Sequence, residues 1–373
     1  MKDRISKYPG RVQLIPVEGQ PGFYDVIRAD EPEEPGTPIS KATLLKDQTA
    51  AVFGLGSEAT VNDVLAALPT RFPRPVLTIT TLYDASIVVT KGDVTYPAGF
   101  VYAAENDIPV RVYTVPLGDL GVYTITASWG QDVGSTTLTV DSVSLYELDA
   151  RMLQCSPVFA NNSWSLIAEM CRCKLIPETW NIGDTKILTL AGNVDQEVRI
   201  YGKGMHKYAD TDRGTAPLTF EFVDLFYGAF YIGPFPEDGV DWVWKYMALR
   251  SSVARTLDSF MPEIRKDIAP MAIHTYSTHP DYSGEDLDTV DSLFLLSYQE
   301  MSQGYYATEN AIRAKRATDG TETLDYVLRT TSYAYSSGTR RPWISGVTAA
   351  GGLTNDLSVG AELYVRAALV FCF

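Results

Sequence analysis

The first part of the chain shows little hydrophobic periodicity and is interrupted by prolines and glycines. Each proline removes a backbone donor and fixes φ, so residues 1–40 are predicted to be extended and to depend on partners for stability. Two short helices are predicted next, one beginning at Ser40 and one in which Thr60 and Asp63 resemble a capping box. The second has the apolar spacing of an amphipathic helix at Val61, Val64, Leu65 and Leu68.

The middle of the chain alternates apolar and polar positions. Single polar residues separate Tyr123, Ile125, Ala127 and Trp129, which is the period of a half-buried strand. Ile108, Val110 and Val112 repeat this period, and glycine-rich turns separate such runs at a spacing typical of sandwiches. Residues 73–150 are therefore predicted to form an all-β, immunoglobulin-like sandwich that acts as a spacer. The Cys–Trp–Cys pattern of antibody domains does not occur.

The last part of the chain mixes helical and strand periods. One helical face, capped by Ser163, comprises Trp164, Ile167, Ala168, Cys171 and Leu175. A second helix, marked by Val253, Leu257 and Phe260, is predicted to stop at Pro262. Strands are predicted at residues 185–191, 196–201, 219–223, 292–297, 325–330 and 363–371. Residues 151–373 are therefore predicted to be an α+β domain, and the whole chain a multidomain protein.

Charge and composition exclude several classes of partner. The formal net charge of −15 disfavours nucleic acid, because phosphate binding requires a basic surface, and it equally disfavours anionic membranes. The amino-terminal residues lack the apolar run of a signal peptide, and no window approaches the length of a membrane span, so we expect no membrane insertion. Buried free thiols are expected at Cys155, Cys171, Cys173 and Cys372.

The sequence offers little sign of catalysis or metal binding. His274 and His279 are five residues apart, which fits neither a helical nor a strand pair of ligands, and a solvated loop is favoured over a metal site with Asp281. An acidic stretch at Asp281, Glu285, Asp286 and Asp288 lacks the EF-hand register. Ser336-Ser337-Gly338 lacks the first glycine of a nucleophile elbow. We therefore predict no catalytic residues, no metal and no cofactor, although a glycosidase-type pair among the 46 acidic residues stays open.

The carboxyl-terminal part also carries an ordered series of landmarks. It resembles the C-type-lectin-like domain that bacteriophages display at the ends of tail proteins and on other virion proteins. This resemblance implies a compact module with its first and last strands side by side, and a homotrimer. It also implies that Arg329 and Arg366 are structural and tie the terminal strands together. The landmarks are Trp180-Asn181-Ile182-Gly183-Asp184, Asp291-Ser292-Leu293-Phe294-Leu295-Leu296-Ser297 with Glu300, Leu328-Arg329-Thr330, and Val365-Arg366-Ala367-Ala368-Leu369-Val370.

The sequence departs from the family in two places, in the calcium-binding motifs and in the residue that follows Arg366. The Glu-Pro-Asn motif of sugar-binding C-type lectins is absent, and Thr354 precedes Asn355-Asp356 where those lectins have tryptophan. This puts calcium-dependent sugar binding in doubt. Ala367 follows the second arginine, where the family usually has proline.

A second resemblance concerns the amino-terminal part. Pro9-Gly10-Arg11-Val12, Gly36-Thr37-Pro38-Ile39-Ser40-Lys41-Ala42 and Leu44-Leu45-Lys46-Asp47 are similar to the leader of tail-associated proteins from phages of Gram-positive gut bacteria. By this resemblance, residues 1–72 dock onto other virion proteins. The protein is then expected in the virion, made in the host cytoplasm and released by lysis.

The candidate ligand-binding residues lie in an expected loop region, Thr331–Asp356. Tyrosine, tryptophan and arginine are enriched at binding hot spots, whereas serine allows adaptable hydrogen bonds. The candidates are Tyr333, Tyr335, Ser336, Ser337, Arg340, Arg341, Trp343, Asn355 and Asp356. The sequence thus favours a phage receptor-binding protein that attaches to a bacterial surface glycan or protein. The alternatives are a capsid or collar decoration protein, and a cell-wall-acting or formylglycine-type enzyme.

Overall fold

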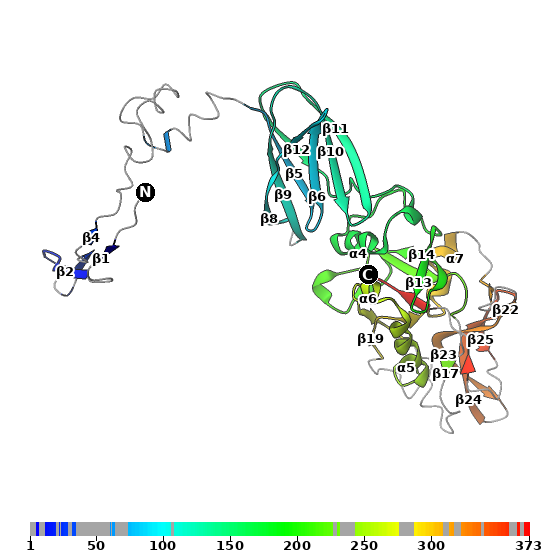
Figure 1. Cartoon of the computed structure of the whole chain (residues 1–373). Helices are drawn as coiled ribbons and strands as arrows, with labels where there is room; N and C mark the ends of the chain where they lie inside the picture. Colours follow the sequence, from blue (N-terminus) through cyan, green and yellow to red (C-terminus); the bar gives the residue numbers. More distant parts are fainter. Residues whose placement is uncertain are drawn as a thin grey trace. The chain divides into compact units, whose positions relative to one another are not determined.

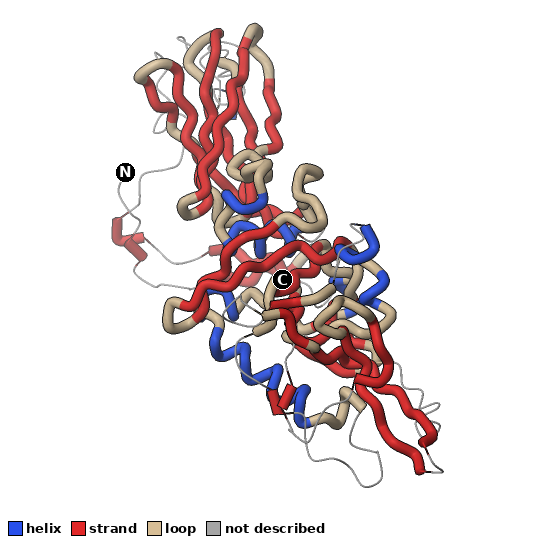
Figure 2. Tube along the Cα trace, turned by 90° about the vertical axis from the view of Figure 1, so that its right-hand side faces the viewer, coloured by secondary structure: helices blue, strands red, loops and turns tan. Residues whose placement is uncertain are grey.

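The computed structural model is built mostly of strands, with a few short helices (Figure 2). Within the part described below, no helix combines the length and the apolar character needed to span a membrane. The structure describes residues 5–6, 12–19, 22, 24–28, 32–34, 60, 62–63, 74–105, 108–226, 230–231, 243–275, 287–308, 313–316, 322–336, 339–357, 364–365 and 369–373.

Contacts between Cα atoms divide the chain into two compact units. The first comprises Met1–Thr78, Thr114–Tyr123 and Thr139–Glu147, and the second comprises Ile79–Tyr113, Thr124–Leu138 and Leu148–Phe373. The second unit therefore combines segments from the middle of the chain with the whole carboxyl-terminal part.

The amino-terminal segment forms short paired strands where only extended chain was expected. β2 (Val12–Pro16) pairs antiparallel with β3 (Tyr24–Arg28), and β1 (Ile5–Ser6) with β4 (Pro32–Glu34). The capping box is confirmed: the Thr60 N–H donates to the Asp63 carboxylate at 2.6 Å, and the Asp63 N–H donates to Thr60 Oγ1 at 3.2 Å. The helix expected at Ser40 lies outside the described residues.

The described residues from 74 to 149 form two four-stranded sheets. One has the order β11-β10-β6-β7 and the other β12-β5-β9-β8. The alternation in β10 is confirmed, since Tyr123, Ile125 and Ala127 are fully buried. The strands are β5 (Val76–Leu82), β6 (Ser86–Lys91), β7 (Val94–Tyr96), β8 (Gly99–Glu105), β9 (Ile108–Pro116), β10 (Gly121–Trp129), β11 (Asp132–Val140) and β12 (Leu145–Asp149).

A five-stranded sheet is the centre of the carboxyl-terminal part (Figure 1). Its order is β13 (Thr185–Leu190), β14 (Val194–Lys203), β16 (Leu218–Phe222), β27 (Leu369–Phe371) and β20 (Phe294–Leu295). The expectation that the first and last strands lie side by side is wrong. β14 and β16 separate them, because β27 pairs with β16 on one side and with β20 on the other.

The predicted first helix is confirmed as α4 (Trp164–Cys173). The Ser163 hydroxyl accepts from the Leu166 N–H at 3.1 Å, and Lys174 ends the helix in the left-handed region at φ 56°. The helix packs on the sheet through aromatic side chains: the Trp164 ring lies 5.7 Å from that of Phe220 and 5.9 Å from that of Phe373. The end of the chain therefore contacts the first helix of this part, even though the terminal strands are apart.

The second predicted helix ends earlier than expected. α5 (Ala248–Arg255) passes into a 3-10 turn, η4 (Thr256–Ser259), and Phe260 is extended and buried. The prediction that Pro262 stops a helix is wrong. Pro262 instead begins α6 (Pro262–Arg265), a position that suits its fixed φ and its missing N–H.

The described part contains further helices and strands. They are η1 (Phe159–Asn161), β15 (Lys207–Tyr208), η2 (Thr211–Arg213), β17 (Phe230–Tyr231), β18 (Met271–Ile273), β19 (Thr289–Asp291), η6 (Glu300–Ser302), α7 (Gly304–Thr308), β21 (Lys315–Arg316), β22 (Thr323–Leu324), β23 (Tyr326–Ser336), β24 (Thr339–Val347), β25 (Leu353–Leu357) and β26 (Tyr364–Val365).

Within the second unit, middle and carboxyl-terminal segments are joined by specific contacts. The Asp132 carboxylate accepts from the Ser163 N–H at 2.9 Å and from its hydroxyl, so β11 is tied to the helix cap. Arg151 reaches Glu105 at 3.0 Å. Leu82 belongs to the same buried apolar cluster as α4. These segments therefore share a continuous core instead of meeting through a flexible linker.

Gly134 offers a direct test of this junction. A Cβ atom at this position would lie 1.7 Å from the backbone carbonyl oxygen of Leu153, which is far inside van der Waals contact. We expect Gly134→Ala to lower the free energy of unfolding by about 1–3 kcal/mol, as overpacking typically does. Urea denaturation measures this. Gly99→Ala is the control, because nothing lies within 4 Å of a Cβ there. Equal unfolding midpoints for the two variants would contradict the prediction.

Candidate binding site

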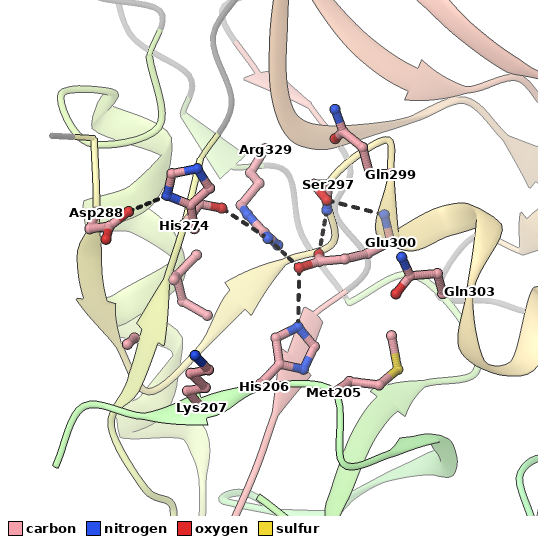
Figure 3. A pocket seen from close by; sticks show the side chains of 12 residues that line it. Met205, His206, Lys207, His274, Asp288, Ser297, Gln299, Glu300, Gln303 and Arg329 are labelled. Carbon is pink, nitrogen blue, oxygen red and sulfur yellow. Dashed lines mark hydrogen bonds and ion pairs between the residues drawn. The ribbon is translucent and has the colours of Figure 1, made fainter. Parts of the chain in front are cut away.

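A polar cavity of about 710 Å³ opens beside the five-stranded sheet (Figure 3). Its walls come from segments that are far apart in the sequence: the β14–β15 connection, β18, the residue before β19, η6 and β23. The lining residues are Met205, His206, Lys207, Ala272, Ile273, His274, Asp288, Ser297, Gln299, Glu300, Gln303 and Arg329.

Glu300 is the central residue of the cavity floor. It begins η6, and its carboxylate accepts from the Ser297 N–H at 2.8 Å while its own N–H donates to the Ser297 hydroxyl at 3.2 Å. Burial raises the pKa of this carboxyl, but the charge of Arg329 and hydrogen bonds from His206 and Arg329 outweigh burial and hold the pKa well below its usual range. Glu300 is therefore a carboxylate at neutral pH, fixed in place by its partners.

Arg329 holds the floor together from β23. Its side chain is 2% exposed and forms an ion pair with Glu300. It also donates to the carbonyl oxygen of Leu295 and, at 3.3 Å, to that of His274. One guanidinium therefore links three separate segments, although none of these partners belongs to the last strand, to which Arg329 was expected to tie its own strand. Arg366, assigned the same role, lies outside the described residues.

His206 closes the other side of the floor. It is 5% exposed, its Nε2 lies 3.3 Å from a Glu300 oxygen, and its Nδ1 lies 3.0 Å from the Thr219 hydroxyl. Its ring also packs against that of Phe294 at 4.8 Å. Because both ring nitrogens face protein partners, His206 positions Glu300 and is poorly placed to accept a proton from a bound ligand.

The rim of the cavity is exposed and has a different chemistry. Gln299, Gln303 and Lys207 are exposed, and they offer amide and ammonium groups. A hydrogen bond joins His274 Nδ1 and the Asp288 carboxylate, and both side chains are more than half exposed. Figure 3 shows the two glutamines on the opposite side of Glu300 from this pair. The site thus has a rigid charged floor and a rim of accessible hydrogen-bonding groups.

The region expected to form the binding loop is instead a sheet. β23, β24 and β25 form an antiparallel three-stranded sheet that Figure 1 shows at one end of this part. The expectation of a loop over Thr331–Asp356 is wrong, since only residues 348–352 of the described stretch fall between strands.

The candidate residues are distributed over these three strands. Tyr333, Tyr335 and Ser336 lie on β23, Arg340, Arg341 and Trp343 on β24, and Asn355 and Asp356 on β25. The register places Tyr333 opposite Pro342, Tyr335 opposite Arg340 and Ser336 opposite Thr339. Ser337 lies outside the described residues. The hairpin therefore brings the six candidates of β23 and β24 near one another along the chain backbone. None of the candidates lines the cavity.

The thiol groups are poorly suited to chemistry. Cys171, Cys173 and Cys372 are buried free thiols, as predicted, whereas Cys155 is only partly buried. Burial raises the pKa of Cys155, Cys173 and Cys372 to about 12, and that of Cys171 well above its ordinary value. A thiolate is the reactive form, so these groups are held unreactive at neutral pH. Of the acidic stretch and His279, only Asp288 is described, and it pairs with His274.

A second charged cluster is buried around Glu221 of β16, and none of its residues lines the cavity. Glu221 is fully buried and lies 2.6 Å from Arg199 and 2.7 Å from Lys315. Lys315 also donates to the Phe222 carbonyl at 2.6 Å, and Arg199 donates to the Tyr306 hydroxyl at 2.7 Å. Burial lowers the pKa of Lys315 to about 8, against the opposing charge of Glu221.

Comparison with known proteins leaves the family undetermined. No protein-family model matches the chain, and no curated protein matches it.

The cavity could be anticipated only in part. Glu300 and Arg329 were recognised as landmarks, but their sequence separation of 29 residues hid their contact. His206 carries no sequence signal, because its partners Thr219 and Glu300 are 13 and 94 residues away in the sequence. Lys207, Gln299 and Gln303 carry no sequence signal, because single exposed polar residues occur throughout the chain. The spacing of Ser297 and Glu300 is that of a capping box, and this was the one local signal available.

Proposed function

We propose that this chain is a bacteriophage virion structural protein that binds a bacterial surface glycan or protein, and that it acts by adhesion instead of catalysis. The observation that carries the proposal is the cavity around Glu300. Its floor charges are neutralised by one another, and its rim presents exposed amide, ammonium and imidazole groups. Preorganised polar groups in a concave site are typical of ligand recognition.

The partners of Glu300 and His206 in the cavity floor support ligand binding over catalysis. A general base must be free to take a proton, and its pKa should lie near the working pH. The pKa of Glu300 is held far below that range, and both nitrogens of His206 have protein partners. The Glu300 carboxylate, paired with Arg329, instead gives the cavity a fixed and charged floor.

The resemblance to displayed lectin-like domains supplies the biological setting of the proposal. In that setting, residues 1–72 dock onto other virion proteins, the middle sheets form an immunoglobulin-like spacer, and three copies present their tips together. Multivalent display turns modest affinity at each cavity into firm attachment. The hairpin of β23 and β24 is then a further contact surface beside the cavity.

Binding to purified cell walls of Gram-positive gut bacteria tests the proposal. The labelled full-length protein should sediment with the walls of susceptible strains, and the double variant Gln299→Ala/Gln303→Ala should lose about tenfold or more in affinity, since each lost hydrogen bond costs about 1 kcal/mol. Gln131→Ala, an exposed glutamine on the turn before β11, is the matched control. Release of soluble wall fragments would show an enzyme. Equal binding by the two glutamine variants would remove the cavity as the site.

A further inference from the structure

The edge strand β8 presents aromatic side chains to solvent. β8 ends the sheet β12-β5-β9-β8, and all seven of its residues are exposed. The Phe100 side chain is 47% exposed and that of Tyr102 is 55% exposed. The two rings share one face of the strand because they are two residues apart. Neighbouring exposed apolar side chains mark interaction sites more often than isolated ones do.

The two rings are held rigidly in place. Tyr102 stacks on Tyr83 with ring centroids 4.7 Å apart, and Phe100 lies edge-on to Tyr102 at 5.5 Å. The Arg111 guanidinium packs against both, with its central carbon 4.5 Å from the Phe100 centroid and 5.3 Å from that of Tyr102. Arg111 is itself fixed by a 3.2 Å hydrogen bond to the Tyr113 hydroxyl. A binding surface formed by these side chains therefore loses little conformational entropy when a ligand arrives.

Polar groups border the same rings. The Arg111 guanidinium donates to the Tyr102 hydroxyl at 3.3 Å. The Asp84 carboxylate lies 3.9 Å from Arg111, and its side chain is 69% exposed. Two half-exposed aromatic rings therefore lie within one small area that also contains a carboxylate acceptor and a phenolic hydroxyl.

We propose that Tyr83, Phe100, Tyr102, Arg111 and Asp84 form a second ligand site, one that binds neutral polysaccharide. A pyranose ring has an apolar C–H face, which suits packing against Phe100 or Tyr102, and hydroxyl groups, which suit the Asp84 carboxylate. The Arg111 charge against the rings disfavours a cationic ligand. The net charge of −15 disfavours a phosphate-rich polymer.

A protein partner fits this surface less well than a sugar. A stable protein interface buries about 800 Å² on each side. The exposed aromatic area consists of two rings on one edge strand, which matches one or two sugar units. The site lies in a part of the chain predicted to be a spacer, and it shares no residue with the cavity around Glu300. The proposal therefore does not depend on the cavity.

Affinity electrophoresis of the full-length protein tests the site. The probes are dextran, β-1,3-glucan, galactomannan and arabinoxylan cast into native gels. We expect at least one polymer to retard the protein. Phe100→Ala and Tyr102→Ala should each weaken that retardation about tenfold, the usual order for a lost aromatic contact. Val101→Ala is the matched control, because Val101 is 63% exposed on the opposite face of the same strand.

A second variant separates binding from folding. Asp84→Ala removes an exposed carboxylate and leaves the apolar core intact, so a weaker retardation with unchanged thermal unfolding supports the site. Failure of all four polymers to retard the protein overturns the proposal, as does unchanged retardation of both aromatic variants. Sedimentation velocity completes the test. A lower mass for Phe100→Ala than for the parent protein would show that copies of the chain cover these rings, which also overturns it.

Discussion

Replacing Arg329 by methionine is expected to lower the free energy of unfolding by about 3–5 kcal/mol, the usual cost of removing one partner of a buried ion pair. Arg329 is 2% exposed and Glu300 is 18% exposed, so the Glu300 carboxylate would lose its main counter-charge while it stays largely buried. The carbonyl oxygens of Leu295 and His274 would lose a donor as well. Urea denaturation at pH 7 measures the change.

Acid titration distinguishes this mechanism from a simple loss of packing. The folded-state pKa of Glu300 lies below its unfolded value, so its contribution to stability is present above about pH 4.5 and is lost as the pH falls through the folded pKa. Without Arg329 that pKa rises, so the stability difference between the two proteins should shrink below pH 4.5. Arg265→Met is the control. It breaks an exposed 2.9 Å pair with Asp258, which should contribute at most about 1 kcal/mol. Equal losses for the two variants would contradict the structural role of Arg329.

Features encoded by adjacent residues were predictable from the sequence. The helix that begins at Trp164 has a cap and an apolar stripe within about a dozen positions, and the structure confirms the cap and the stripe as far as Cys171. Leu175, expected on the same face, lies beyond the helix end at Lys174. The capping box of Thr60 and Asp63 is equally local. The buried side of β10 followed from simple alternation.

Features that depend on distant partners were not predictable. β27 is three residues long, and its central place in the sheet depends on pairing with β16 and β20. A loop is expected in place of the hairpin of β23 and β24 because the resemblance places a late loop region there, and because tyrosine, serine and glycine suit a recognition loop. The alternation of tyrosine with small residues around Tyr333 and Tyr335 was the strand signal that the turn-forming residues obscured. The cavity joins His206 to Glu300 across 94 residues, and no short-range pattern contains that information.

Glu221→Gln is expected to destabilise the protein at least as much as the loss of Arg329. Glu221 is fully buried and faces two cations, Arg199 and Lys315, so the neutral amide would leave both without their counter-charge. Breaking a buried pair from one side typically costs about 3–5 kcal/mol, and here one substitution breaks two pairs. Chemical denaturation at pH 7 measures this, with Glu197→Gln, an exposed glutamate on β14, as the control.

The pH dependence should identify Lys315 as the origin of part of that cost. In the parent protein, the pKa of Lys315 is about 8 when folded and 10.5 when unfolded, so the unfolded chain binds more protons between these values and stability rises with pH in this window. Removing Glu221 lowers the folded-state pKa of Lys315 further. In Glu221→Gln, the rise of the free energy of unfolding with pH should therefore begin below pH 8. The loss in free energy of unfolding of Glu221→Gln, relative to the parent protein, should therefore be smaller at pH 9 than at pH 7.

Ionisation of cysteines in the unfolded chain affects both proteins equally and cancels. Adding Lys315→Met to both proteins should abolish the pH dependence of the difference. A deficit that stays constant from pH 7 to pH 9 would mean that the lysine is not the group left unpaired.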